Sequence, residues 1–447
     1  MSIPLRRLGN CFEGVIPSIV ATLDTNGIPN VSYLSQVHMV DDDHVALSNQ
    51  FFSKTLANVQ ETGRASVLVV DGRNGDQYEL DLEFERATQS GETFARIALH
   101  IEATAAQHGS GIAWGLRSAD IYRVVDCRAV PSPPDVADEP VEPVRGDILP
   151  AAARVVSDIA AAADPDAMLD RVLDGLTQDF GYSNAIVLVM DGRGDRLTTL
   201  GSRGYPLGGV GSETPLGLGA IGMAAATGRP VRISDMSRGR RFAAAVRGDA
   251  GPDPSRIIPL PGLAEPQSQL AAPMISHAQT RGVLFVEDEQ RFRFTQADED
   301  ILVMIAAQLA ACLRLWDLEG AGGSRPASDR AQAAAPGPAF RVRYYAFDDS
   351  LFIDDAYLIK GVPGRLLFYF LTAHSETGRV DFTNRELRLD AALRLPDLKD
   401  NLETRLILLR RRLEEKAAPV RLTRPGRGHI RLELSGVPHL EVVAGPA

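Results

Sequence analysis

Two segments of unusual composition divide the chain and constrain how it can fold. Residues 131–150 read PSPPDVADEPVEPVRGDILP, and residues 319–338 read EGAGGSRPASDRAQAAAPGP. Neither segment can bury enough side chain to compensate the entropy lost on ordering, so both are predicted to be linkers. They leave segments 1–130, 151–318 and 339–447, each of ordinary domain size.

Charge and cysteine usage exclude several classes of protein. The net charge of −11 argues against a general coat for nucleic acid or anionic membranes. Cys11, Cys127 and Cys312 are far apart and form no CxxC pair, which fits neither a disulfide framework nor a zinc site. The start lacks the apolar region of a signal peptide, and no segment is apolar and long enough to span a membrane. We therefore expect a cytoplasmic protein.

The fold class expected for the chain is multidomain α+β. Strand patterns dominate the first segment, which predicts a small, mostly antiparallel barrel with a few helices. In the second, two amphipathic helices broken at Asp164-Pro165 precede a run of strands, and Thr295 with Asp298 fits the cap of a last helix. This order predicts a sheet with helices packed on one face.

The third segment has the outline of a winged helix. Strand patterns precede a helix, and Thr383 with Glu386 is spaced as a capping box for a second helix. A third helix, 401–416, comes before two strands around the turn 425–428. In that helix, a stripe predicted to be buried leaves Arg405 and Arg412 toward the opposite side, where phosphates could be met. The stripe consists of Leu402, Leu406, Leu409 and Leu413.

A candidate anion site lies in the first segment, in SNQFFSKT, residues 48–55. Ser53 is a good N-cap, the free amides of the following turn can face an anion, and Lys54 adds a positive charge. The alternative is that Ser53 only caps its helix and Lys54 is solvated.

The first segment, notably residues 21–71, resembles the pyridoxamine-phosphate oxidase-like split barrels that bind flavin mononucleotide (FMN). The resemblance implies that Val31 and Ser32 line the flavin and its ribityl chain. It also implies that Ser48 and Asn49, followed by Ser53 and Lys54, hold the ribityl phosphate. This chain has no arginine in the strand near Ser32, so the barrel either binds FMN or has kept the fold and lost the flavin. His38 and His44 flank an acidic turn and are expected to be solvated.

The second segment, from 217–235 (GLGAIGMAAATGRPVRISD) onward, resembles a GAF domain, which implies a sensor with a pocket for a small molecule. Its ligand cannot be read from the residues, and the lone Cys312 is expected to pack within the last helix. An apolar stripe on that helix can form a dimer seam, cover its own sheet, or do both. The stripe contains Ile301, Met304, Ile305, Leu309 and Cys312.

The third segment resembles the OmpR/PhoB-type winged helix of response regulators. The resemblance implies that Arg405 reads a base or phosphate, that Arg411 and Arg412 contact phosphates, and that Arg424 or Arg427 is the wing residue. Asp400 and Leu408 depart from the family pattern. Either the DNA site is unusual, or the domain has become a protein-binding surface.

Together these features predict a one-component transcriptional regulator. Its split barrel and GAF domain would sense a small molecule or redox state, and its winged helix would bind DNA, with a homodimer as the expected assembly. Two alternatives stay open. In one, the barrel is an FMN-dependent oxidoreductase regulated by the other domains; in the other, the chain is a protein-interaction scaffold.

Overall fold

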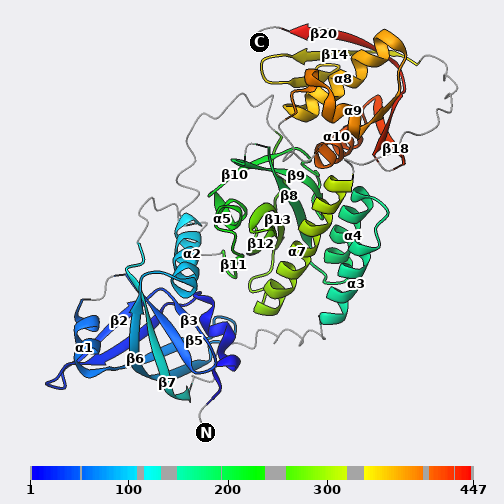
Figure 1. The fold of residues 1–447 in the computed structure, drawn as a ribbon. Helices are drawn as coiled ribbons and strands as arrows, with labels where there is room; N and C mark the ends of the chain where they lie inside the picture. Colours follow the sequence, from blue (N-terminus) through cyan, green and yellow to red (C-terminus); the bar gives the residue numbers. More distant parts are fainter. Residues whose placement is uncertain are drawn as a thin grey trace.

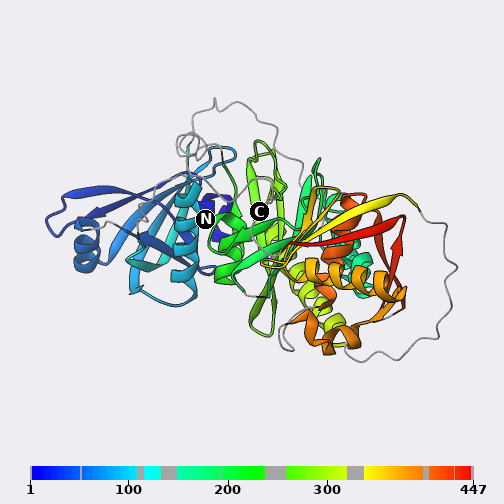
Figure 2. The same ribbon diagram turned by 90° about the horizontal axis from the view of Figure 1, so that it is seen from above.

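The computed structural model describes residues 3–50, 53–107, 115–131, 148–192, 194–236, 258–319, 337–395, 402–426 and 428–443. These residues form three domains that follow one another in chain order, with the second domain between the other two (Figures 1 and 2). Among the described residues, no helix combines the length and hydrophobicity needed to cross a membrane.

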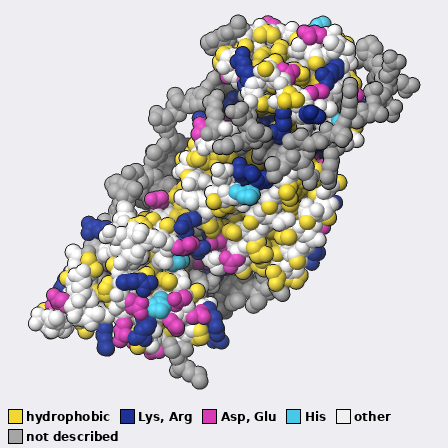
Figure 3. Space-filling model, viewed as in Figure 1, with side chains coloured by type: hydrophobic (Ala, Val, Ile, Leu, Met, Phe, Trp, Pro, Cys, Tyr) yellow, Lys and Arg dark blue, Asp and Glu magenta, His cyan; other side chains and the backbone are white. Residues whose placement is uncertain are grey.

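The first domain is a curled antiparallel sheet with the strand order β2-β1-β5-β6-β7-β4-β3. Its inward side chains, among them Val20, Val45 and Val67, form one core beneath the short helix η1. Ion pairs cover its outer surface, such as Arg128 Nη1 with Asp81 Oδ2 at 2.6 Å between β7 and β6. Figure 3 shows charged side chains of both signs interleaved over this domain. The elements are η1 (Leu5–Glu13), β1 (Ser18–Leu23), β2 (Pro29–Leu34), β3 (Val37–Met39), β4 (His44–Asn49), α1 (Lys54–Thr62), β5 (Arg64–Val70), β6 (Gln77–Thr88), α2 (Glu92–Gln107) and β7 (Ser118–Val130).

The second domain is a six-stranded antiparallel sheet with the order β10-β9-β8-β13-β12-β11. Strand β8 is buried on both faces: Val187 packs with the helices α3, α4 and α7, whereas Ile186 and Leu188 pack with α5. The predicted break at Asp164-Pro165 is present: α3 ends before it, and Asp164 Oδ1 caps α4 by accepting a hydrogen bond from Ala167 N. The elements are α3 (Leu149–Ala160), α4 (Pro165–Gln178), β8 (Asn184–Met190), β9 (Arg196–Arg203), β10 (Glu213–Pro215), α5 (Gly219–Thr227), β11 (Val231–Ile233), β12 (Ser268–Ser276), β13 (Gln279–Asp288) and α7 (Gln296–Glu319).

The cap predicted for the last helix of this domain is also present. Asp298 Oδ2 accepts from Thr295 N at 2.8 Å and from Thr295 Oγ1 at 2.6 Å. In the stripe that follows, Ile301, Ile305 and Leu309 are buried in the core of the domain, while Met304 is exposed. Most of the stripe therefore covers its own sheet, and Cys312 packs at its edge.

The third domain combines two small sheets with three helices. Strands β16-β15-β14-β20 form one sheet, in which β14 and β20 are parallel, and β17-β19-β18 form the other. Half of the capping box predicted at Thr383 is present: its Oγ1 accepts from Glu386 N, whereas the Glu386 carboxylate pairs with Arg379. The elements are β14 (Ala339–Tyr345), β15 (Ser350–Ile353), β16 (Ala356–Ile359), α8 (Val362–Thr377), β17 (Asp381–Thr383), α9 (Asn384–Leu389), η3 (Ala391–Leu393), α10 (Leu402–Glu415), β18 (Val420–Gly426), β19 (His429–Leu434) and β20 (Val437–Val443).

Candidate functional site

The residues predicted to hold a flavin come from three neighbouring elements of the first domain. Val31 and Ser32 lie on β2, Ser48 and Asn49 end β4, and Ser53 and Lys54 open α1. Two hydrogen bonds tie these elements together: Asn30 Nδ2 donates to Thr55 Oγ1 at 2.9 Å, and Ser35 Oγ donates to Gln50 Oε1 at 2.6 Å. The fold therefore brings the predicted residues to one region of the barrel.

Ser48 and Asn49 are buried and already serve the barrel itself. Ser48 Oγ accepts from Gln36 N at 3.0 Å, and Asn49 Nδ2 donates to Ser118 Oγ and to Asp120 Oδ2, both at 3.2 Å. Burial raises the pKa of the Asp120 carboxyl, and the hydrogen bonds from Ser118 and Asn49 oppose that rise. Both residues thus fix the end of β4, and a phosphate would have to displace or share these bonds.

Ser53 and Lys54 are exposed and fit an anion better. Ser53 occupies the N-cap position, but its side chain makes no capping hydrogen bond, contrary to the expected cap. Its backbone is in the αR region rather than the extended region typical of a cap, which explains the difference. The first turn of α1 carries no acidic residue. The Ser53 hydroxyl and the Lys54 ammonium are therefore suited to bind a phosphate.

The structure adds a basic residue that sequence reasoning missed. Arg117 lies just before β7, and its backbone N donates to Asn49 O at 2.8 Å. Arg117 is exposed, and its backbone lies beside the end of β4, where Ser48 and Asn49 lie, although β2 carries no arginine. Hydrogen bonding across the sheet creates this proximity, so only the pairing of β4 with β7 could have revealed it.

One histidine expectation is wrong and one holds. His44 lies at the surface, where its Nδ1 is 2.8 Å from Asp41 Oδ1 and its Nε2 is 3.3 Å from Glu85 Oε1. His38 instead turns inward, because β3 packs against η1 and α2, and burial lowers its pKa to about 4. It lines a cavity together with His100 of α2.

The second domain also holds a buried polar group on its sheet. Glu287 of β13 accepts from Leu263 N at 2.8 Å and from Gln269 Nε2 at 3.0 Å. Burial raises the pKa of this carboxyl, and the hydrogen bonds from Leu263, Gln269 and Tyr205 oppose the rise. Tyr205 follows β9, so its hydroxyl and the Glu287 carboxyl lie together on the sheet. The small-molecule pocket that the GAF resemblance implies stays a prediction.

One of the predicted DNA-contacting arginines, Arg411, lies at the interface with the second domain, beside Arg410. Arg411 Nε donates to Asp166 Oδ1 at 3.2 Å, and its Nη2 lies 3.1 Å from Asp170 Oδ1; both acids belong to α4 of the second domain. Arg410 Nη2 lies 3.1 Å from the same Asp166 oxygen. A Cβ at Gly201 of β9 would lie 3.0 Å from Arg411 Nη1, so glycine permits this approach. Helix α10 is thus docked on the second domain.

Asp166 is the centre of this contact. Its side chain is almost fully buried, which raises its pKa, while the charges of Arg410, Arg411 and Arg424 oppose that rise. A second link is made by Lys360 Nζ, 3.0 Å from Glu213 Oε2 of β10. The buried side chains of the second and third domains form one continuous hydrophobic cluster.

The expectation that Arg405 and Arg412 face outward is wrong. Their exposed fractions are 7% and 5%, because α10 is packed both by its own domain and by the second domain. Arg412 Nε donates to Leu358 O at 2.8 Å, and its Nη1 donates to Glu415 Oε2 at 2.8 Å. The leucine stripe itself is buried as predicted.

The basic end of the chain is therefore largely neutralised by local acids. Arg424 Nη1 of β18 lies 2.6 Å from Glu403 Oε2 of α10, which ties the hairpin to the helix. Arg431 Nε donates to Asp381 Oδ1 at 2.7 Å. Arg427 and Asp400 lie outside the described residues. The roles of these arginines in binding DNA stay predictions.

Comparison with known families supports two of the three domains. Residues 11–124 match the family model described as pyridoxamine 5'-phosphate oxidase, and residues 162–314 match the model described as GAF domain. The chain therefore carries a split barrel of the pyridoxamine-phosphate oxidase type and a GAF domain. Neither matched range reaches the third domain. No match was found among curated proteins.

Solved structures resemble single domains of this chain. The GAF domain of a phosphoenolpyruvate-protein phosphotransferase from Acinetobacter is 23% identical, with a TM-score of 0.31, over 38% of this chain and 93% of that one. A free methionine-R-sulfoxide reductase from Neisseria meningitidis is 24% identical, with a TM-score of 0.29, over 37% and 87%. An FMN-binding protein from Syntrophomonas wolfei is 21% identical, with a TM-score of 0.24, over 28% and 86%.

Proposed function

We propose that this chain is a one-component regulator whose split barrel and GAF domain control DNA binding by the third domain. The first two domains support a sensory or regulatory role. The third has helices α8, α9 and α10 followed by the β18–β19 hairpin, the order expected of a winged helix. The observation that carries the proposal is the docking of α10 on the GAF domain through Arg410 and Arg411.

This docking makes DNA binding and the closed arrangement mutually exclusive. A guanidinium that pairs with Asp166 cannot also contact a phosphate, and a helix covered by the GAF domain cannot enter a major groove. DNA would therefore select an open arrangement in which α10 leaves α4. A ligand that binds the two arrangements with different affinity would shift their populations and thereby regulate the output.

The split barrel would contribute a redox or ligand input. The exposed Ser53 and Lys54 would hold the phosphate of FMN, and the exposed Val31 would support its ring system. When bound, FMN would supply one- or two-electron redox chemistry. Flavin absorbance after reconstitution, lost in the Lys54→Ala variant and retained in Arg86→Ala, would support this assignment; a colourless wild type would contradict it.

We infer that the protein forms a homodimer through its barrels. Four large apolar side chains are exposed on the β1–β2 hairpin, where a second copy would cover them: Leu23, Ile28, Val31 and Tyr33. Contiguous exposed apolar surface of this kind marks interaction sites. Light scattering should give a dimer for the wild type and a monomer for Tyr33→Glu; a monomeric wild type would contradict the inference.

A selection for bound sequences tests the DNA role directly. Full-length protein would be used to enrich a random duplex pool, and binding of the enriched duplex would be measured across salt concentrations. Arg427→Ala should weaken binding and lower the salt dependence by about one phosphate contact. Arg86→Ala, an exposed change on the barrel, should leave binding unchanged. Failure to enrich any sequence, or equal binding by the Arg427 variant, would contradict the proposal.

A permanently docked third domain is the second candidate, and one observation favours it. Leu408 lies one turn before Arg411 on the same side of α10 and is buried. An apolar side chain suits a lasting protein interface better than a DNA groove. In that case the third domain would be part of a scaffold, and no DNA sequence would be enriched by any variant.

A further inference from the structure

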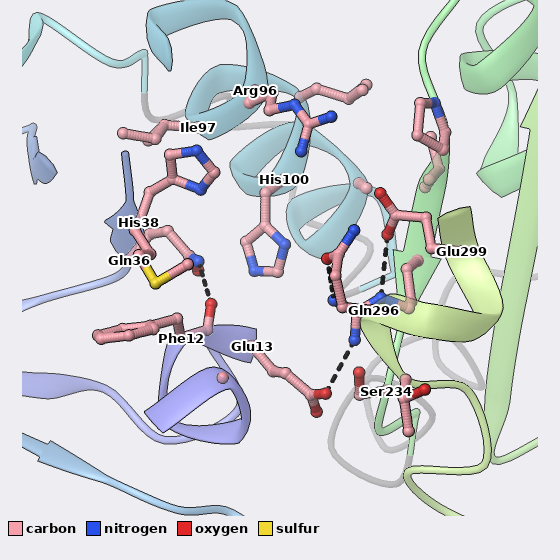
Figure 4. A pocket seen from close by; sticks show the side chains of 18 of the residues that line it. Phe12, Glu13, Gln36, His38, Arg96, Ile97, His100, Ser234, Gln296 and Glu299 are labelled. Carbon is pink, nitrogen blue, oxygen red and sulfur yellow. Dashed lines mark hydrogen bonds and ion pairs between the residues drawn. The ribbon is translucent and has the colours of Figure 1, made fainter. Parts of the chain in front are cut away.

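A cavity of about 480 Å³ lies where the split barrel meets the GAF domain (Figure 4). The barrel lines it with η1, β3 and α2, and the GAF domain lines it with β11, the two residues before that strand, and the start of α7. Its volume is typical of sites for small organic molecules. The residues predicted for FMN do not line it. The cavity is therefore a separate candidate site.

The two acidic side chains in the cavity wall are already paired. Glu13 Oε1 accepts from Arg232 Nη1 at 2.8 Å and lies 3.6 Å from Arg73 Nη2. Glu299 Oε2 accepts from Arg232 Nε at 3.0 Å. Two guanidinium groups therefore compensate two carboxylates. Because this network is saturated, it shapes the wall and leaves recognition of a ligand to other residues.

Two further arginines line the cavity from opposite domains. Arg96 belongs to α2 of the barrel, and Arg229 lies just before β11 of the GAF domain. Both are near the same carboxylate oxygen, Glu92 Oε1, which is 3.6 Å from Arg96 Nε and 3.0 Å from Arg229 Nη1. The two guanidinium groups are therefore close enough to hold one carboxylate between them.

Glu92 shows where an anion is favourable, but it does not fill the cavity. It is not among the lining residues, and its side chain is 71% exposed, so its ion pairs with the two arginines are weak. Apart from Glu92, neither guanidinium group has a hydrogen-bond or ion-pair partner among the described residues. A ligand carboxylate can therefore replace Glu92 or share the two arginines with it.

His38 of β3 provides a third donor near Arg96, and Figure 4 shows its ring on the same side of the cavity as the Arg96 guanidinium. Burial, together with the charge of Arg96, lowers the pKa of His38 to about 4, so its neutral ring keeps one N–H. Among the described residues, none is a hydrogen-bond partner of this ring. Apolar side chains line the adjoining space: Met39, Ile97, Leu99 and Val231.

We propose that the cavity binds a small organic carboxylate with an apolar body, of the size of a short branched or aromatic acid. Its carboxylate is held by Arg96, Arg229 and the N–H of His38, and its body packs against the apolar lining. Because the two arginines belong to different domains and repel each other, an anion between them stabilises the contact of barrel and GAF domain. The inference goes beyond the proposed regulator: the ligand would be one input to it, but its binding does not depend on DNA binding.

Thermal unfolding of the full-length protein tests this site. The probes are benzoate, 3-methylbutanoate, hexanoate and 3-phenylpropanoate, each at about 10 mM and constant ionic strength, a concentration that reveals even millimolar affinity. At least one probe should raise the Tm of the wild type, and calorimetry then gives its Kd. Arg96→Gln and Arg229→Gln should each weaken binding of that probe at least about tenfold, the effect of losing one charge-assisted contact. Arg86→Gln, an exposed arginine outside the cavity, is the matched control.

Glu92→Gln should change the affinity in the opposite direction. It removes the carboxylate that competes for the two arginines, so the active probe should bind about two- to fivefold more tightly. A variant that only disturbed the fold would not strengthen binding. Unchanged or weaker binding by Glu92→Gln would contradict the placement of the ligand carboxylate between Arg96 and Arg229.

Neutral and inorganic probes separate this proposal from simpler binding. The uncharged amide of the active acid should bind at least about tenfold more weakly, since it lacks the charge that the arginines recognise. The proposal is overturned if no probe raises the Tm, if the amide binds equally, or if both arginine variants bind the probe as tightly as the control. Equal stabilisation by sulfate or phosphate at the same concentration would overturn it in favour of a general anion site.

Discussion

The GAF domain has a neighbour on each side, and the two contacts differ in construction. Toward the third domain, buried side chains of both domains form one cluster, and the buried Asp166 pairs with two arginines. Toward the barrel, α2 also joins a buried cluster through Leu99 and Ala103, but the polar contact around Arg232 leaves a cavity. The contact with the third domain is closely packed, whereas the contact with the barrel encloses a cavity large enough for a small molecule. The two contacts lie on opposite sides of the GAF domain, so in the proposed regulator input and output would be separated by that domain (Figure 1).

Among the variants considered, removal of the Asp166 carboxylate should weaken a domain contact most. Asp166→Asn leaves Arg410 and Arg411 at a buried interface without their shared carboxylate, which typically costs about 3–5 kcal/mol. Hydrogen exchange should show a corresponding fall in the opening free energy of α10. Asp170→Asn is the control, because its side chain is 44% exposed and its loss should cost under about 1 kcal/mol. If both variants lowered the opening free energy of α10 equally, the buried carboxylate of Asp166 would matter no more to the docking than the exposed carboxylate of Asp170, which would contradict this account.

Breaking the barrel contact should cost less. Glu13→Gln removes one partner of Arg232, but Glu299 and Gln296 still accept from it. We expect the protection of α2 amides to fall by about 1–3 kcal/mol, the cost of weakening a charge-assisted hydrogen bond. Glu92→Gln, which removes only an exposed ion pair with Arg229 across the same contact, should have little effect. A loss as large as that of Asp166→Asn would show that both contacts are equally tight.

Gly14→Ala tests how closely Gln36 and His100 pack against the backbone beside the cavity. Gly14 has a φ of +71°, and a Cβ there would lie 2.0 Å from Gln36 Oε1 and 2.5 Å from His100 Nε2. We expect a destabilisation of about 2 kcal/mol from strain plus this clash. Gly27→Ala is the control, since its φ is +78° and no atom lies within 4 Å. If Gly14→Ala and Gly27→Ala lost equal unfolding free energy, the strained backbone conformation alone, and not the clash with Gln36 and His100, would cause the destabilisation.

The two cavity histidines should have the smallest effect at neutral pH, because they change stability only as the pH becomes acidic. Burial, with Arg96 near His38 and Arg232 near His100, lowers their folded pKa from 6.5 to about 4, and Glu92 opposes this at His38. The folded state therefore binds fewer protons, and its unfolding free energy falls as pH drops from 6.5 toward 4. His38→Gln with His100→Gln should flatten this slope. An unchanged slope would contradict the assignment.

Local features of the sequence predicted local structure well. The caps at Thr295 and Thr383 and the break at Asp164-Pro165 were recognised, because each depends on residues within one helical turn. The leucine stripe of α10 also predicted its own buried face. Both family resemblances that were confirmed depend on residues within single domains.

Contacts between domains could not be predicted in this way. Arg411 meets Asp166 across 245 residues, and no pattern in either helix encodes that meeting. Periodicity shows which face of α10 is apolar but not what covers the other face, so Arg405 and Arg412 were expected at the surface. His38 and His100 meet for the same reason, through packing of β3 and α2.

The affinity of full-length protein for an enriched DNA duplex, compared between the wild type and Asp166→Asn, tests the central claim most directly. If docking of α10 opposes DNA binding, the variant should bind about 5- to 150-fold more tightly, the range of typical coupling between sites. Asp170→Asn should show a smaller increase. Equal affinities of the wild type and Asp166→Asn, or the absence of any enriched sequence, would contradict the claim.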